Sequence, residues 1–297
     1  MCSGEIQNGV INVHFCVDIR SQILQRLSAT PLHGIEDTAL ALLALRNTGA
    51  DPSQLIHTQR SSGSWSEFPN AGPPTAFHTA LALLALRAFP RPPRASADLG
   101  FQWLSGVRGR ESHWLWQWRF RLFDRQVQFD PKKSGWPWVP GTVSWVAPTA
   151  LSMLAHRAWR RDSPRLASAT AMLLDRACRQ GGWNAGNSVV FGVSLEPQPD
   201  FTAMALLALR DSPYARGSLA DRSLDYLARR FEASPATYSL AWASIALAAY
   251  GHPDADRPRN QLETAVSVRI NEVPPRILAL AALALEEPPY AFRESIQ

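Results

Sequence analysis

The sequence predicts an all-α protein in which six helix pairs form an α6/α6 toroid. The first observation is a repeated word: TALALLAL begins at Thr38 and again at Thr79. A buried helix needs apolar residues of suitable size but leaves their identity largely free, so an identical word indicates duplicated units. Weaker copies begin at Thr149, Thr202, Leu240 and Leu278. Spacings of roughly forty residues fit two helices and two connections per unit.

The second observation is an amphipathic segment before each copy. These segments span residues 19–27, 52–59, 95–107, 165–180, 218–231 and 260–270. Their apolar residues form one stripe, whereas the repeated-word helices are apolar all round and must be covered on every side. We therefore expect inner and outer helices, and no sheet. An open solenoid is the alternative, but the last inner segment, RILALAALALEE, is as apolar as the first, although a terminal repeat needs a polar face.

The connections provide a third observation. Residues 59–65 fit the pattern Q-x3-G-x-W, and residues 134–141 and 181–187 are variants of it. Gly63 allows a tight exit from the outer helix, and Gln59 can bond exposed helix-end groups. We expect Trp65 and Trp183 to act as struts on the outer surface.

Composition and length predict one domain over residues 1–297, with an N-terminal extension at 1–16 and an insertion at 107–146 that is a candidate lid. The chain is 46% hydrophobic and 19% charged, which is typical of a globular protein. A net charge of +5 comes from scattered arginines. A solvated surface explains them, and a phosphate-bearing or anionic-membrane partner is the alternative.

No export signal or long apolar run is apparent, and the three cysteines have no metal-binding spacing. We therefore expect a cytoplasmic protein, with peripheral membrane contact left open. The usual nucleotide-, serine-hydrolase- and zinc-protease motifs and an aspartate-rich DDxxD are absent from the sequence. We expect no cofactor, no metal and no nucleic-acid partner, and the sequence identifies no partner protein.

Residues 59–65, 135–155 and 181–192, together with the repeated-word helices, resemble the prenyltransferase and squalene oxidase repeat family. This family includes squalene-hopene cyclases and protein prenyltransferase β subunits. The resemblance implies an α/α toroid with an apolar cavity that holds isoprenoid chains.

The resemblance also implies candidate catalytic residues. Class II terpene cyclases carry D-x-D-D-T-A at the start of an inner helix, and the aligned stretch here begins at Gly34 and places Glu36 where the general acid lies. Asp37 and His78 would tune that acid. Protein prenyltransferase β subunits hold zinc with D-x-C and a His, and the matching positions are Glu36, Thr38 and His78. Threonine cannot replace a thiolate ligand, so zinc catalysis is not expected.

Each candidate also has a structural explanation. Glu36 and Asp37 are favoured at a helix N-terminus by the helix dipole, and His78 fits a hydrogen-bonded core position. Asp200 occupies the same repeat position as Glu36, two residues before the Thr, but three repeats away. In a six-fold ring the two acids would face each other across the mouth.

Aromatic residues are the candidates for binding substrate. Residues 113–124 alternate aromatic and polar positions, which favours a strand or an extended lid. Such a segment can close the cavity, stack on a ligand or grip a membrane interface. The residues expected to bind substrate are Phe77, Trp116, Trp138, Trp145, Phe201, Tyr238 and Trp242.

The sequence leaves two functional hypotheses. The first is an isoprenoid-handling enzyme resembling a single-domain class II terpene cyclase, with an apolar isoprenoid-like molecule as its partner. Aromatic walls would stabilise carbocations by cation–π attraction. The alternative is a non-catalytic lipid- or protein-binding toroid scaffold.

Overall fold

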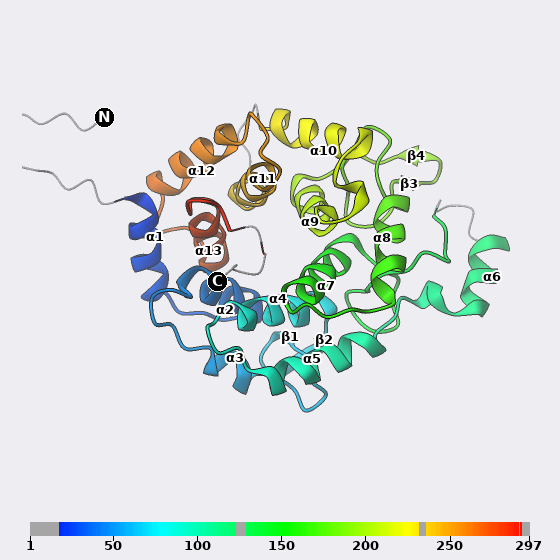
Figure 1. The fold of residues 1–297 in the computed structure, drawn as a ribbon, viewed down its shortest axis with the longest axis horizontal. Coiled ribbons are helices and arrows are strands. Elements are labelled where there is room, and N and C mark those ends of the chain that lie inside the picture. The colour runs from blue at the N-terminus through cyan, green and yellow to red at the C-terminus, as the bar shows by residue number, and fades with distance from the viewer. Residues whose placement is uncertain (1–17, 123–128, 232–235, 291, 293–297) are drawn as a thin grey trace, which may run out of the picture.

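The computed structural model describes residues 18–122, 129–231, 236–290 and 292; the predicted extension at residues 1–16 lies outside them. The described helices form two concentric layers (Figure 1). The inner helices are α2 (Ile35–Leu45), α4 (Ala76–Arg87), α7 (Val146–Ala158), α9 (Pro199–Leu209), α11 (Thr237–Tyr250) and α13 (Pro275–Ala284). The outer helices are α1 (Ile19–Ser28), α3 (Ser53–His57), α5 (Arg94–Gly106), α8 (Arg165–Asp175), α10 (Ser218–Arg229) and α12 (Asp256–Val268).

The inner helices form a closed ring. Each contacts the next in the order α2, α4, α7, α9, α11 and α13, and α13 packs back against α2. At this closure Arg46 Nη2 donates to Glu286 Oε1 over 2.7 Å, and Arg20 Nε donates to the carbonyl of Ala282 over 3.0 Å. The predicted α-toroid is confirmed, and the open solenoid is excluded by the contact between α13 and α2.

Burial follows the predicted pattern. In α4 every residue from Ala76 to Leu86 is buried, whereas α5 buries only one face. The repeated alanines let neighbouring inner helices approach closely. Among the described residues, no helix combines the length and the apolar character that crossing a bilayer would require.

The tryptophans of three connections share one hydrogen-bonding role. The backbone N–H of Trp65, Trp136 and Trp183 donates to the hydroxyl of Thr79, Thr149 and Thr202, respectively, at 2.9–3.0 Å. Each indole N–H donates to a carbonyl near the end of an outer helix, at Leu55, Leu104 and Leu173. Each Trp therefore joins the end of an outer helix to the start of an inner one, which explains the Thr at the start of three of the repeated words.

These tryptophans correct one expectation. Trp65 and Trp183 are fully buried, so they are internal struts between the layers and not struts on the outer surface. Gln59 acts as expected: its Nε2 donates to the carbonyls of Gly63 and Ser96, and it joins the connection to the first turn of α5.

Replacing Thr202 by Val is expected to lower the free energy of unfolding by about 1–3 kcal/mol, because the buried N–H of Trp183 loses its acceptor. Thr38→Val is the matched control, since the Thr38 hydroxyl donates to the carbonyl of Gly34, one turn earlier at the start of α2. Chemical denaturation of both variants checks this. Equal losses would contradict the role given to the Thr–Trp hydrogen bond.

Two further expectations were wrong. The structure contains two small antiparallel hairpins, β1 (Ser66–Phe68) with β2 (Ala71–Pro74), and β3 (Val189–Val190) with β4 (Val193–Ser194). Each forms where the connection from an outer to an inner helix doubles back, and its residues are mostly exposed or partly exposed. The aromatic stretch after His113 is helical, forming α6 (Trp114–Leu122), so the alternating pattern did not indicate a strand. On this helix the tryptophans do not lie on a single face: Trp114 and Trp118 share one face, and Trp116 lies on the opposite one.

Candidate functional site

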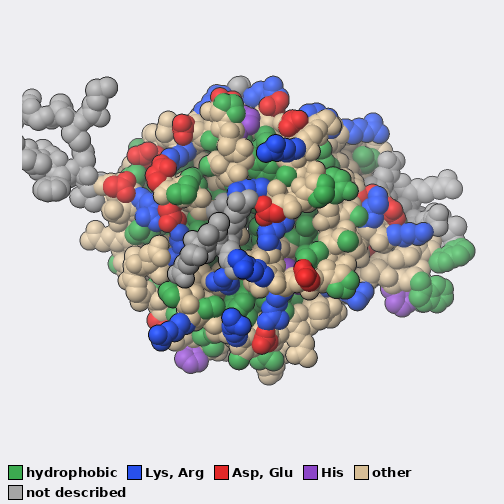
Figure 2. Space-filling model, in the orientation of Figure 1, with side chains coloured by type: hydrophobic (Ala, Val, Ile, Leu, Met, Phe, Trp, Pro, Cys, Tyr) green, Lys and Arg blue, Asp and Glu red, His purple; other side chains and the backbone are tan. Residues whose placement is uncertain are grey.

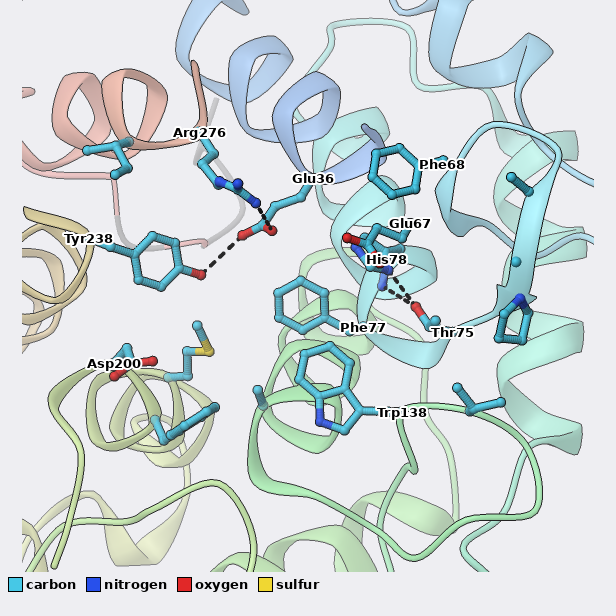
Figure 3. Close-up of a pocket in the computed structure, with 18 residues that line it drawn as sticks. Glu36, Glu67, Phe68, Thr75, Phe77, His78, Trp138, Asp200, Tyr238 and Arg276 are labelled. Carbon is cyan, nitrogen blue, oxygen red and sulfur yellow. Dashed lines mark hydrogen bonds and ion pairs between the residues drawn. The ribbon is translucent and has the colours of Figure 1, made fainter. Parts of the chain in front are cut away.

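One repeat position builds the wall of a cavity at the start of the inner helices. The position two residues before each repeated-word start is held by Glu36, Phe77, Ala147, Asp200, Tyr238 and Arg276. All of these residues line one cavity of about 700 Å³ (Figure 3). This volume lies within the range of roughly 300–1,000 Å³ that is usual for small-molecule sites. Each side chain is placed in the first turn of its helix, where the ring has its mouth.

Other segments complete the cavity. The β1–β2 hairpin contributes Glu67 and Phe68, and the predicted insertion contributes Trp138 and Val139. Phe201 and Met204 extend the wall along α9. The hairpin is placed here because Thr75, directly before α4, is held by a hydrogen bond from its N–H to the carbonyl of Trp65.

Glu36 lies between a phenol and a guanidinium (Figure 3). The Tyr238 hydroxyl donates to Glu36 Oε1 over 3.2 Å, and Arg276 Nη1 lies 3.5 Å from Oε2. Burial raises the pKa of Glu36, and Arg276 and the Tyr238 hydrogen bond oppose that rise. Burial also holds the pKa of Tyr238 well above its ordinary value, so the phenol remains a hydrogen-bond donor.

Asp200 is the second acid of the mouth. Burial raises its pKa, and the backbone N–H groups of Asp200 and Phe201 oppose that rise. The ring order α2, α4, α7, α9 separates Asp200 from Glu36 by three helix positions, and Figure 3 shows the two acids on different walls of the same cavity. The cavity therefore holds two carboxyl groups that burial shifts towards the protonated form.

His78 is buried beside the aromatic wall. Its Nδ1 lies 2.7 Å from the Thr75 hydroxyl, which also accepts from the His78 N–H. The Phe77 ring stacks on Trp138 with centroids 4.7 Å apart. Burial lowers the pKa of His78 to about 4, so the imidazole is neutral at pH 7.

The depressed pKa of His78 predicts acid sensitivity. Between pH 7 and pH 5 the unfolded chain, with an ordinary pKa of 6.5, takes up a proton that folded His78 does not. The linkage costs about 2 kcal/mol of stability over that interval, and the loss grows as pH falls towards 4. The raised pKa values of Glu36 and Asp200 act in the opposite direction, since their ionisation destabilises the fold as pH rises.

His78→Asn isolates the histidine contribution, because the amide keeps a partner for Thr75 and does not titrate. Denaturation curves at several pH values are expected to show a smaller loss between pH 7 and pH 5 for the variant, by about 2 kcal/mol. Parallel pH dependence of the two proteins would contradict a buried neutral His78.

The structure does not bring all predicted residues together. Asp37 lies outside the cavity, with its Oδ1 3.9 Å from Arg276 Nε. Trp116 lies on α6, Trp145 precedes α7 and packs against Gly186, and Trp242 is buried against Phe292. Glu36, His78, Asp200, Phe77, Trp138, Phe201 and Tyr238 do line the cavity; their catalytic and binding roles stay predictions.

Arg276, Glu67 and Phe68 are the charged and aromatic cavity residues that sequence reasoning missed. The signal for Arg276 was present, since it occupies the repeat position that singled out Glu36 and Asp200. Glu67 and Phe68 belong to the hairpin that was not expected, so no repeat position marks them. Among the described residues, no cluster of three or more His, Cys, Asp or Glu side chains is arranged to hold a metal ion.

Comparisons with known proteins agree with the fold. No protein-family model matches the chain, and no curated protein matches it in sequence. A solved protein from Actinoplanes is 15% identical, with 86% of this chain and 82% of that chain covered and a TM-score of 0.58. Candida albicans protein geranylgeranyltransferase-I complexed with GGPP is 12% identical, with coverages of 90% and 89% and a TM-score of 0.50.

A third solved structure is Salmonella alpha-2-macroglobulin reacted with methylamine, which is 14% identical with a TM-score of 0.50. The match covers 90% of this chain but only 17% of that chain. At such identities the likeness shows a shared α-toroid fold and nothing about chemistry. The fold therefore defines a class of architecture that different activities use.

Proposed function

We propose that the mouth cavity binds a neutral isoprenoid-like molecule and that Glu36 protonates it, as in a class II terpene cyclase. The observation that carries this proposal is a pair of partly buried carboxyl groups with raised pKa values, Glu36 and Asp200, in an aromatic-walled cavity. A general acid must be protonated at rest and able to release its proton. Burial supports the first requirement, and Tyr238 with Arg276 supports the second, because both stabilise the carboxylate that remains.

The charges of the cavity favour a neutral substrate. Its lining includes three acids, Glu36, Glu67 and Asp200, and one arginine, Arg276. A diphosphate would find one cationic side chain in this lining, Arg276, which already lies beside Glu36, and that single charge does not neutralise it. The GGPP in the geranylgeranyltransferase-I structure therefore supports the proposal only through the shared fold and the apolar part of such a molecule.

The proposed step moves one proton. Protonated Glu36 transfers its proton to one carbon of an alkene, so that the O–H bond and the π bond break and a C–H bond forms. The resulting carbocation faces the rings of Phe77, Trp138 and Tyr238, whose π electrons attract a cation. A neighbouring carbon then loses a proton to the ionised form of Asp200, whose raised pKa makes it the stronger base, and the product alkene forms. Proton exchange with solvent restores both carboxyl groups.

Mass spectrometry of the purified protein tests the proposal. Lipid extracts identify any copurified molecule, and incubation with squalene and shorter polyprenes identifies products. Wild type and Asp37→Asn are expected to form product, since Asp37 lies outside the cavity. No bound lipid and no product with any polyprene would contradict the proposal.

A second candidate is a non-catalytic lipid-binding toroid. The observation that favours it is the layer beneath the mouth cavity, four residues along each inner helix, where the side chains are buried: Leu40, Leu81, Leu151, Met204, Trp242 and Leu280. Met204 of this layer also lines the cavity, so the mouth has an apolar floor that can hold a lipid without any chemistry. Under this alternative the same mass spectra would show a bound lipid that remains chemically unchanged.

A further inference from the structure

The outward face of α6 is unusually apolar for an exposed helix. Trp114, Leu115 and Trp118 are exposed by 63%, 54% and 63% of their surface, respectively. Their spacing of one and four positions places them on one side of the helix. Figure 1 shows α6 projecting from the edge of the ring, and Figure 2 shows hydrophobic side chains gathered at that edge. An apolar face of this kind is typical of an interaction surface.

The inward face of α6 contacts the segment directly before it. The Trp116 ring lies beneath the guanidinium of Arg110 at 4.7 Å and that of Arg119 at 5.2 Å. Gln117 Nε2 donates to the carbonyl of Ser112 over 3.4 Å. Trp116 and Gln117 are partly buried, so one side of α6 faces residues 110–112 and the other faces solvent.

The exposed charges around this apolar face are positive. Arg108, Arg110, His113 and Arg119 are exposed. Glu111 is the acid of this stretch, and it is fully buried, where its carboxylate accepts from the N–H of Ser144 over 3.0 Å. The charged side chains described at the surface between residues 107 and 119 are therefore basic.

A second cavity of about 820 Å³ lies between α5 and α6. It is lined by the basic residues Arg108, Arg110 and His113 and by the aromatic residue Trp103. Pro140 and Gly141 line it as well, and they directly follow Trp138 and Val139, which line the mouth cavity. One short segment thus contributes to both cavities.

We propose that α6 docks on an anionic phospholipid membrane. Trp114, Leu115 and Trp118 enter the boundary between headgroups and acyl chains, and Arg108, Arg110 and Arg119 pair with lipid phosphates. Tryptophan beside arginine suits this boundary, where apolar area and attraction to anionic lipid add together. Because the exposed charges around the apolar face are positive, the bilayer that fits this surface is an anionic one. Docking would bring the second cavity, between α5 and α6, to the lipid headgroups. Residues 138–141 connect that cavity to the mouth cavity.

Vesicle sedimentation tests this docking surface with the full chain. Wild type is expected to bind vesicles of phosphatidylserine and phosphatidylcholine, to bind pure phosphatidylcholine less, and to lose binding as salt is added. Trp114→Ser with Trp118→Ser is expected to weaken binding at least about tenfold, because the inserted aromatic area is removed. Arg108→Glu with Arg110→Glu is expected to abolish the preference for anionic vesicles.

Val268→Ser is the matched control. Val268 is 74% exposed on α12, which Figure 1 places on the other side of the ring from α6, and its variant is expected to bind as wild type does. No binding of wild type to anionic vesicles, or unchanged binding of the Trp variant, would overturn the proposal. A self-association that the Trp variant abolishes without any vesicle binding would overturn it too. These vesicles contain no isoprenoid, so the result is independent of the chemistry proposed for the mouth.

Discussion

Glu36→Gln is expected to lower product formation by about 10²–10⁴-fold, the usual contribution of a positioned general acid. Glutamine keeps the length of the side chain and an oxygen that accepts from Tyr238, but it has no carboxyl proton to transfer. Binding of the polyprene is expected to change little, since the aromatic wall of Phe77 and Trp138 is untouched. Product formation rates and bound lipid, measured by mass spectrometry on the same samples, separate the two effects.

Two variants complete this test. Asp200→Asn removes the proposed proton acceptor and is expected to change the products or stop their release. Asp37→Asn is expected to change the rate far less than Glu36→Gln, since Asp37 lies outside the cavity and makes only a minor contribution to the raised pKa of Glu36. If Glu36→Gln turns over at the wild-type rate, Glu36 is not the acid. A bound lipid that remains unaltered in wild type and in every variant would favour the non-catalytic toroid.

Gly63→Ala is expected to lower the free energy of unfolding by about 3 kcal/mol or more, combining a strained backbone with overpacking. Gly63 has a φ of +90°, which side chains rarely adopt, and a Cβ placed there would meet the carbonyl oxygen of Leu99 in α5. That neighbour is backbone and cannot rotate away, so the connection would have to move relative to α5.

Gly49→Ala is a matched control for the backbone term. Gly49 has a φ of +81°, and an added Cβ would meet no atom within 4 Å. Its variant is expected to lose only about 1–2 kcal/mol, the cost of a left-handed conformation for a residue with a side chain. Thermal and chemical denaturation of both variants measure the difference. Equal losses would mean that the close approach of Gly63 to α5 contributes nothing.

The fold was predictable because the sequence repeats show both the pattern and the order of the helices. An apolar helix that must be covered on every side, preceded by a half-apolar one, has few packings, and the repeated word shows that the same packing recurs. The hairpins and α6 were not predictable in the same way. Their form depends on how a connection turns between an outer and an inner helix, and the aromatic alternation after His113 is compatible with both a strand and a helix.

The cavity was predictable in part. Glu36 and Asp200 occupy the same position in their repeats, and this predicted that they would lie at the same mouth. Residues at one repeat position lie at the same level along the axis of a ring of repeats. Applied to all six helices, the rule also gives Tyr238 and Arg276, which hydrogen-bond and pair with Glu36. Cavity residues that lie outside the repeats, such as Trp138 and Phe68, could be placed at the cavity only from the structure.

The contact of α13 with α2 affects how the chain reaches its folded state. Glu286, which pairs with Arg46 beside that contact, is synthesised 240 residues after it. Until α13 has left the ribosome, one apolar flank of α2 and one of α11 have no neighbour. A nascent chain of this architecture therefore exposes apolar, aggregation-prone surfaces through most of its synthesis. We expect it to depend on chaperones until α13 has been synthesised.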